Sequence, residues 1–359
     1  MLPSRTHIVL LLLSIAVMLY SCGKPRKAAE IQPSVAETEM LLQYLEENGN
    51  LINSEAIPAL ISAADLHEQL VANNIHIIDL RPAADFESGH ISHSVNVQPG
   101  DILDYFEQRI EPGSFDQIVL VCPNAQLSAF VNAVLLFLGY DNVHALRFGL
   151  SSWDQEIAER HWLAALSNHL EGQLETTGYP KNDPGVLPAI ATGKTHGYQI
   201  LRARAKEVLD TSFEDLGRTL QDITTAEDPV YLANYWPESL YNRGHLPGAI
   251  QYTPKVSLHS AEDIRTLPAD RAVVMYCFTG QHSSYVTAFL RLLGYDAYSL
   301  AYGANSFIHN TMVTTQPPGR SFTEERIGHF PLAGKVPGAV APKELQPTQK
   351  EAAPVIGGC

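Results

Sequence analysis

The sequence predicts an α/β protein made of two copies of one domain, each with a parallel sheet covered by helices on both faces. Two observations support this prediction. A shift of 155 residues superimposes landmarks of the first half on the second and carries Cys122 onto Cys277. Within each half, short runs of strand-forming residues alternate with segments of helical periodicity. Together they favour a duplicated domain over two unrelated ones.

The constant offset extends well beyond the two cysteines, and its register does not slip across the matched span. The matching segments share glycine, histidine, glutamine, serine and tyrosine residues: Gly89–Ile91 with Gly244–Leu246, Gln126–Ser128 with Gln281–Ser283, and Leu138–Asp141 with Leu293–Asp296. After a one-residue deletion, Gly149–Trp153 also resembles Gly303–Phe307. Chance seldom matches rare residues at one offset, so we infer a duplication.

Each cysteine is expected between a buried strand and a helix. Strands are predicted at Ile75–Leu80 and Gln117–Val121, and at Val273–Tyr276 in the second copy. Apolar residues recur at helical spacing through Phe130–Leu138 and Val286–Leu293, which predicts a helix after each cysteine. The switch from strand to helix is where open α/β sheets place ligands.

Composition sets the expected domain boundaries. The first domain is placed at 57–165 and the second at 197–313, while residues 36–56 are expected to form a short helix and an approach to the first domain. Glycines and prolines mark 166–196 as a linker or irregular crossing. Beyond that, 314–359 is rich in Pro, Gly, Ala and Lys and predicts a low-complexity C-terminal tail, largely disordered.

Charge and cysteine spacing exclude several classes of function. A net charge of -15, from 39 acidic and 24 basic residues, argues against a nucleic-acid partner, because such surfaces need clustered positive charge. The four cysteines stand at positions 22, 122, 277 and 359, too far apart for a disulfide framework or a paired metal-ligand spacing. We therefore predict no metal site and no bound cofactor.

The N-terminus predicts export. A short basic start precedes the apolar run Ile8–Leu19, which is too short for a comfortable membrane span and is typical of a signal peptide over residues 1–21. The run ends in Leu19-Tyr20-Ser21-Cys22, which resembles the lipobox of bacterial lipoproteins, where the cysteine is lipidated. This resemblance implies a lipid anchor at Cys22 in the bacterial cell envelope, on the periplasmic side or at the outer membrane. A plain secretory signal and an uncleaved anchor are the alternatives.

The location of Cys122 and Cys277 suits thiol chemistry. In an oxidising exported compartment a free thiol is a liability unless it is buried or used. A turn that leads from a strand into a helix can point several backbone N–H groups into one concavity, at the positive end of the helix. Both effects stabilise a thiolate, and the same cradle would hold the sulfur and oxygens of a thiosulfate-like donor.

These motifs resemble the rhodanese family, which includes thiosulfate and mercaptopyruvate sulfurtransferases, over about 57–162 and 197–313. The resemblance implies a five-stranded parallel sheet with helices on both faces in each domain. It also implies a cysteine that accepts a sulfane sulfur as a persulfide and passes it to a thiophilic acceptor. In tandem rhodaneses the cysteine of the second domain commonly works, while the first domain is structural.

The two loops depart differently from the family pattern, which often reads Cys, two residues, Gly, one residue, Arg, Ser. The second copy keeps Gly280 and Ser283 but has His282 in place of the arginine. The first copy has lost both glycine and arginine, Pro123 lacks an N–H, and Ala125 takes a positive φ less cheaply than glycine. Cys277 is therefore the preferred nucleophile. Cys122 is a secondary candidate, for which structure and chemistry are both open.

We predict a rhodanese-type sulfurtransferase with a persulfide at Cys277 and a small-molecule sulfur donor. A thiol or cyanide would act as the acceptor. The substrate-binding loop is expected to comprise Phe278, Thr279, Gly280, Gln281, His282 and Ser283. His282 could supply positive charge near the donor, or could simply face solvent at the helix entry. The alternative function is a noncatalytic module that binds sulfur species or a protein partner in the cell envelope.

Phosphatase chemistry on the same fold is disfavoured, because the arginine that clamps phosphate six positions after the cysteine is replaced by Ser128 and Ser283. Other polar residues have expected structural roles: Asp79 and Arg81 as strand-end anchors, and His90 and His245 as hydrogen-bonding groups. Trp153, Trp236 and Phe307 either line a pocket mouth or pack in the core. We further hypothesise that Cys359 accepts sulfur from Cys277, with an inert chain end as the alternative, and oligomeric state is left open.

Overall fold

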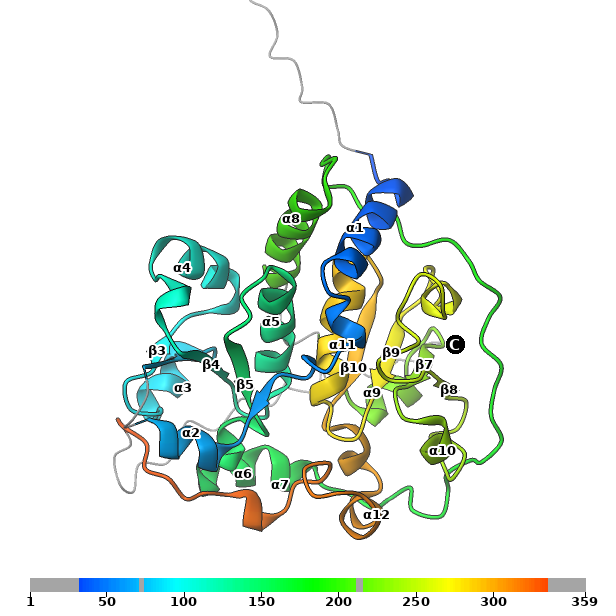
Figure 1. The fold of residues 1–359 in the computed structure, drawn as a ribbon. Coiled ribbons are helices and arrows are strands. Elements are labelled where there is room, and N and C mark those ends of the chain that lie inside the picture. The colour runs from blue at the N-terminus through cyan, green and yellow to red at the C-terminus, as the bar shows by residue number, and fades with distance from the viewer. Residues whose placement is uncertain (1–31, 71–73, 211–215, 335–359) are drawn as a thin grey trace, which may run out of the picture.

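The computed structural model describes residues 32–70, 74–210 and 216–334 (Figure 1). The predicted signal peptide, Cys22 and Cys359 lie outside the described residues. Within the described ranges, no helix is long and apolar enough to cross a membrane.

The first domain has a parallel five-stranded sheet in the order β1-β5-β4-β2-β3. Its strands are β1 (Leu60–Ile61), β2 (Ile75–Asp79), β3 (Val95–Asn96), β4 (Gln117–Val121) and β5 (Val143–Leu146). Its helices are α2 (Ala63–Gln69), α3 (Ala83–Ser88), α4 (Ile102–Gln108), α5 (Gln126–Phe137), α6 (Gln155–Arg160) and α7 (Trp162–Ala165). The strands predicted at 75–80 and 117–121 are confirmed.

The second domain repeats this topology in the order β6-β10-β9-β7-β8, which confirms the predicted α/β class. Its strands are β6 (Gly217–Arg218), β7 (Tyr231–Asn234), β8 (Ile250–Gln251), β9 (Val273–Tyr276) and β10 (Ala297–Leu300). Its helices are α8 (Gly197–Leu209), α9 (Leu220–Thr224), α10 (Glu238–Tyr241), α11 (Gln281–Leu292) and α12 (His309–Thr315), and α1 (Val35–Glu47) precedes the first domain. Short 3-10 helices occur at Leu51–Asn53, Pro99–Asp101, Pro112–Ser114, Gly149–Ser152, Ile264–Thr266, Gly303–Ser306 and Glu324–Arg326.

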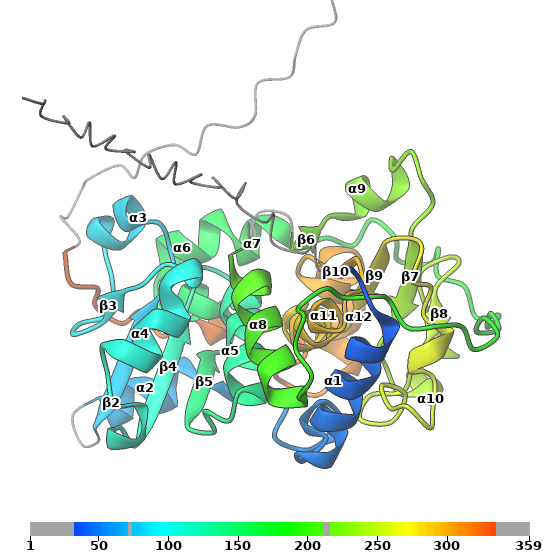
Figure 2. The same cartoon turned by 90° about the horizontal axis from the view of Figure 1, so that it is seen from above.

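Helices α5 and α11 pack against each other between the two sheets (Figures 1 and 2). Helices α1 and α8 pack together beside them, and α8 contacts both α5 and α11. The Phe137 and Phe289 rings meet across this interface at 5.8 Å. Buried side chains from both sheets belong to one apolar cluster, so the two domains share a core.

The chain after the second domain returns to the first, which corrects part of the predicted tail. Residues 316–334 cross beneath α2, α6 and α7, where Figure 1 draws them in orange and red. The Phe322 ring is fully buried and lies 5.3 Å from Phe148 and 5.2 Å from Trp162. His90 and Ala333 then exchange two backbone hydrogen bonds. The apolar residues of this segment stand singly among prolines, glycines and charges, so only distant partners reveal that they are buried.

Residues 166–196, the predicted linker, form no helix or regular strand. Contacts with the rest of the chain nevertheless fix this crossing, among them the bridges from Glu175 to His245 and from Ile190 to Ser34. It runs over the surface of the second domain, where water can bind the backbone polar groups of a segment that forms no helix or sheet.

Candidate functional site

Both cysteine loops follow the same backbone path from a central strand into a helix. Cys277 follows β9 directly, and Gly280 with φ +76° caps the start of α11. In the first copy Ala125 takes φ +73° at the equivalent position before α5. Loss of the glycine has therefore not changed the course of the first loop, although the left-handed conformation costs an alanine about 1 kcal/mol more than a glycine.

A second loop packs directly against each cysteine loop. The amide of Ala304 donates to the Cys277 carbonyl at 3.1 Å, and the amide of Leu150 does the same to Cys122 at 2.8 Å. A Cβ atom at Gly303 would lie 2.4 Å from the Cys277 carbonyl oxygen. This close approach explains why Gly303 recurs in the repeat.

The Cys277 thiol is held by Ser283. The Ser283 amide and hydroxyl lie 3.3 and 3.4 Å from Cys277 Sγ. Ser299 Oγ lies 2.7 Å from Ser283 Oγ and fixes that hydroxyl. Cys277 is only 2% exposed, so the sulfur lies beneath the surface rather than at the mouth of an open pocket.

The Gln281 side chain serves the contact between the domains. Its Oε1 accepts a hydrogen bond from the Phe148 amide at 3.0 Å. In the reciprocal contact, Gln126 Oε1 accepts from the Tyr302 amide, also at 3.0 Å. Both side-chain oxygens thus reach the other domain, while the Gln281 amide donates to Thr279 Oγ1 in its own loop at 3.4 Å.

Phe278 lies under two large neighbours. Its ring stacks on Trp236 with 5.0 Å between centroids, and the Arg320 guanidinium carbon lies 4.3 Å from the Phe278 centroid. Asn305 Nδ2 donates to the carbonyls of both Phe278 and Arg320, at 2.7 and 2.9 Å. The cysteine loop and the C-terminal segment are thereby fastened to each other.

Arg320 was not among the residues predicted from the sequence. It lies beyond the expected end of the second domain, and no motif marks it. Burial lowers the pKa of its guanidinium, and the nearby Cys277 thiolate opposes that shift. Arg320 thus places a positive charge near Cys277, where the loop itself has none. In the sequence, the indication of a further cation was the absence of the family's arginine from the cysteine loop.

His282 does not provide that charge. Burial, and then the nearby Lys255 ammonium, lower the pKa of His282 to about 4. Its Nε2 is buried without a hydrogen-bond partner, and the ring packs edge-on against Tyr235 at 5.1 Å. This lowered pKa favours a neutral imidazole at physiological pH and argues against His282 as the cation near the donor.

Comparison with known proteins places this geometry in a family. The sequence profile of the rhodanese-like domain matches residues 62–156 and 205–310, more than half of the chain. The chain belongs to the rhodanese-like family. The thiosulfate sulfurtransferase GlpE of Pseudoalteromonas translucida is 26% identical over 101 residues, which span 28% of this chain and 92% of that protein.

Matches to solved structures are at lower identity. A thiosulfate sulfurtransferase from Pseudomonas aeruginosa is 18% identical with a TM-score of 0.29, and the match covers 72% of this chain and 45% of that one. SseA of Escherichia coli, described with the 3-mercaptopyruvate sulfotransferases, is 15% identical with a TM-score of 0.23 and coverage of 68% and 98%.

Cys122 occupies the position equivalent to Cys277 in the first rhodanese-like domain, but its surroundings differ. Its side chain is fully buried, and burial raises the pKa of the thiol, while hydrogen bonds from Ser128, Asn124 and Ala125 oppose this shift. The Ser128 amide lies 3.3 Å from Sγ. A neutral thiol is a weaker nucleophile, which favours a structural role for Cys122.

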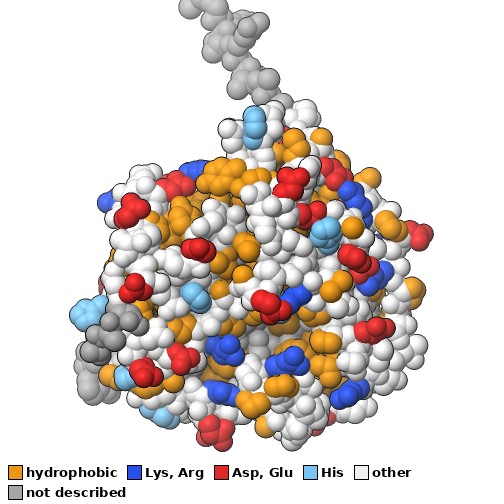
Figure 3. Space-filling view, in the orientation of Figure 1, with side chains coloured by type: hydrophobic (Ala, Val, Ile, Leu, Met, Phe, Trp, Pro, Cys, Tyr) orange, Lys and Arg blue, Asp and Glu red, His pale blue; other side chains and the backbone are white. Residues whose placement is uncertain are grey.

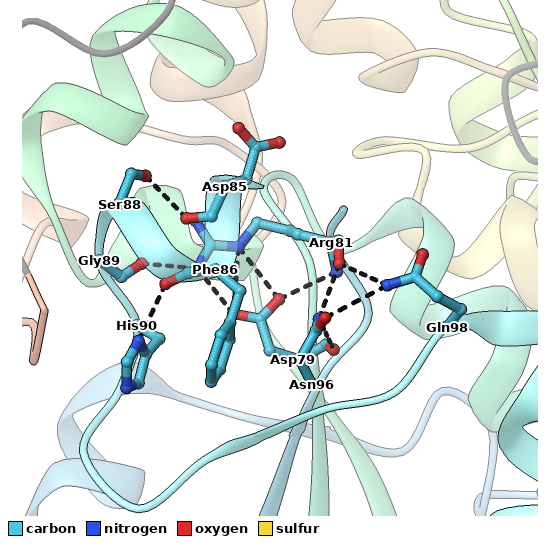
Figure 4. Close-up of polar contacts among 9 residues, drawn as sticks. All are labelled: Asp79, Arg81, Asp85, Phe86, Ser88, Gly89, His90, Asn96 and Gln98. Atoms are coloured by element: carbon cyan, nitrogen blue, oxygen red, sulfur yellow. Dashed lines mark hydrogen bonds and ion pairs between the residues drawn. The ribbon is translucent and has the colours of Figure 1, made fainter. Parts of the chain in front are cut away.

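Asp79 and Arg81 anchor the end of β2 in the first rhodanese-like domain (Figure 4). Arg81 Nη2 lies 2.7 Å from Asp79 Oδ2 and donates at 2.7 Å to the Gly89 carbonyl, and both charged side chains are buried. In the second domain Asn234 Oδ1 accepts from the Trp236 amide at 3.1 Å, as Asp79 Oδ1 does from Arg81 at 3.0 Å. The anchoring bond survives without the ion pair.

The two histidines of the repeated Gly-His pair have the predicted structural role. His90 Nδ1 lies 2.9 Å from the Phe86 carbonyl, and His245 Nδ1 lies 2.9 Å from that of Tyr241. Trp153, Trp236 and Phe307 are all buried and pack in apolar clusters. Among the described residues, no three His, Cys, Asp or Glu side chains gather as a metal site.

Proposed function

We propose that this rhodanese-like protein is a sulfurtransferase that carries a sulfane sulfur as a persulfide on Cys277. The observation that supports this proposal is that the Ser283 amide and hydroxyl face Cys277 Sγ at the start of α11. An amide, a hydroxyl and the positive end of a twelve-residue helix all favour negative charge on sulfur. Arg320 adds a full positive charge nearby.

The proposed reaction has two displacements at sulfur. The Cys277 thiolate attacks the outer sulfur of thiosulfate, the S–S bond of the donor breaks, and sulfite leaves with the bonding electron pair. A thiolate or cyanide then attacks the terminal sulfur of the persulfide and releases the Cys277 thiolate. Because Cys277 is 2% exposed, both steps require the side chains that cover the sulfur to move aside.

A noncatalytic module is the second candidate, and the burial of both thiols favours it. In that case the altered loops would bind a sulfur species or a protein partner without turnover. Neither cysteine would then be needed as a nucleophile.

Thiosulfate:cyanide assays on the wild type, Cys277→Ser and Cys122→Ser separate the two candidates. We expect sulfur transfer to be lost in Cys277→Ser and kept in Cys122→Ser. Intact-mass analysis after thiosulfate treatment should find a gain of about 32 Da, one sulfur atom, on the peptide that contains Cys277. A wild type that shows neither turnover nor adduct would overturn the enzymatic proposal in favour of the binding module.

We also propose a lipid anchor at Cys22 that holds the protein in the bacterial cell envelope, supported by the lipobox-like stretch that ends at this residue. Membrane fractionation of cells that express the wild type or Cys22→Ser tests it. The wild type should sediment with membranes and the variant should not. Equal fractionation of both proteins would count against the anchor.

A further inference from the structure

A cleft in the first domain is lined by two arginines and stands apart from Cys277. It has a volume of about 200 Å³ and lies where the C-terminal segment crosses the start of α2 and the loop after β5. Phe148 and Ile327 line it with apolar surface, and Arg147 and Arg326 also face it. Basic side chains gather on the lower part of the face in Figure 3, where the C-terminal segment crosses.

The two guanidinium groups are close enough to oppose each other's charge. Burial lowers the pKa of Arg147, Arg326 lowers it further, and the Asp65 carboxylate partly opposes these shifts. Arg147 Nε is buried and has no hydrogen-bond partner. Within the described part of the chain, neither arginine forms an ion pair.

The fold does not require an arginine at position 147. The Arg147 amide donates to the Ile61 carbonyl at 2.8 Å and continues the sheet. At the same place in the second domain, the Ala301 amide donates to the Arg218 carbonyl at 2.8 Å with no long side chain. The half-buried cation at position 147 is therefore an addition to the repeated framework.

We propose that this cleft binds a small tetrahedral oxyanion of the sulfate type between Arg147 and Arg326. Guanidinium groups match such anions through paired N–H donors, and a bound anion would neutralise two charges that otherwise repel each other. The exposed Glu325 carboxylate lowers the net positive charge of the cleft, and the volume of about 200 Å³ favours a small ligand. Binding needs neither cysteine and is independent of the proposed sulfur transfer.

Isothermal titration of the full chain with sodium sulfate, at an ionic strength fixed with sodium chloride, tests the site. Arg147→Gln and Arg326→Gln should each weaken sulfate binding about tenfold. Arg109→Gln, which removes an exposed arginine after α4, should bind as the wild type does. Arg326→Gln keeps the test decisive if Arg147→Gln folds poorly.

Competition experiments with other anions identify the class of ligand. Phosphate should compete with sulfate, whereas acetate should not. Absence of sulfate binding to the wild type, equal binding by all variants, or preference for acetate would each overturn the proposal. Sulfate binding that disappears in Cys277→Ser but persists in Arg147→Gln would also overturn it, because the anion would then belong to the cysteine loop.

Discussion

We propose that Arg320 compensates for the arginine that is missing from the cysteine loop. Its guanidinium lies over the Phe278 ring, and the nearby Cys277 thiolate raises its pKa against the effect of burial. We expect Arg320→Gln to lower kcat/KM for thiosulfate about 10- to 100-fold, because an anionic donor and a developing thiolate both lose a nearby cation. Arg320→Lys should recover part of the rate, since it restores charge but not the planar stacking group.

The matched control for Arg320 is Arg160→Gln. Arg160 is an exposed arginine of α6, whose Nε donates to the Glu156 carbonyl at 3.3 Å. The Arg160→Gln substitution should leave kcat/KM unchanged in steady-state thiosulfate:cyanide assays. Equal activities of Arg320→Gln and the wild type would exclude a contribution from this cation.

His282 links stability to pH. Its folded pKa of about 4 lies below the ordinary value of about 6.5, so the fold favours the neutral imidazole. This contribution is fully present above pH 6.5 and is lost as the pH falls toward 4. We expect the free energy of unfolding of His282→Gln to fall less between pH 7 and 4.5 than that of the wild type, by on the order of 1–3 kcal/mol.

Urea unfolding of both proteins at a series of pH values measures this difference. His161, whose pKa burial also lowers to about 4, provides the comparison within the same chain, because its contribution persists in His282→Gln. Parallel curves for wild type and variant would show that the buried imidazole does not carry the acid sensitivity.

At the scale of single residues, the sequence could locate the loop but not its surroundings. Cys277, Gly280 and Ser283 stand close together in the chain, so their spacing was visible. Cys277 is buried, and the neighbouring Phe278 ring packs against Trp236 and Arg320, which only the folded chain brings together. Arg320 and the neutral state of His282 were missed for the same reason.

At the scale of elements, the two loops that meet at Cys277 leave no room for a side chain at Gly303. Gly303→Ala combines a φ of +55° with a Cβ that would lie 2.4 Å from the Cys277 carbonyl oxygen. Gly139→Ala has a φ of +98° but no heavy atom within 4 Å of the added carbon. We expect losses of about 2–4 kcal/mol for Gly303→Ala and about 1 kcal/mol for Gly139→Ala in urea unfolding.

The two substitutions isolate the effect of packing, because only backbone conformation is disturbed at Gly139. If both cost the same, the close approach of the loops would not matter for stability. Gly303→Ala should also reduce sulfur transfer, since Cys277 and Gly280 must shift to make room.

Element prediction succeeded where the apolar pattern was long. Strands β2, β4 and β9 and helices α5 and α11 lie in runs of four or more residues with clear periodicity. The edge strands β1, β3, β6 and β8 have two residues each, too few for any period to show. These strands form only by pairing with a strand that is distant in the sequence. Their prediction therefore came from the family resemblance and not from periodicity.

The whole molecule is held together by contacts that the duplication made nearly symmetrical. Gln126 and Gln281 matched in the sequence because each reaches into the other domain, yet sequence reasoning assigned Gln281 to the substrate loop. Tyr285 adds a bond across the interface, with its hydroxyl 2.8 Å from both the Ala59 carbonyl and Asn132 Nδ2. Two domains were predictable from the repeat, but their shared core was not.

Phe322 fastens the C-terminal segment to the first domain and thereby holds Arg320 in place. Its buried ring packs against both Phe148 and Trp162, so Phe322→Ala should lower the free energy of unfolding by about 3–5 kcal/mol. Val313→Ala, which trims a side chain that is 43% exposed, should be nearly neutral. Urea unfolding measures both changes.

The same substitution should also change the chemistry of the second domain, although Phe322 packs against the first. Loosening the segment removes the cover from Phe278, so iodoacetamide should alkylate Cys277 faster in Phe322→Ala under conditions where both proteins stay folded. Cys122, which lies beneath a different loop, provides the internal reference by peptide mapping. Faster alkylation at Cys277 alone would mean that the C-terminal segment controls access to the sulfur, whereas equal acceleration at both cysteines would mean that the shared core had opened as a unit.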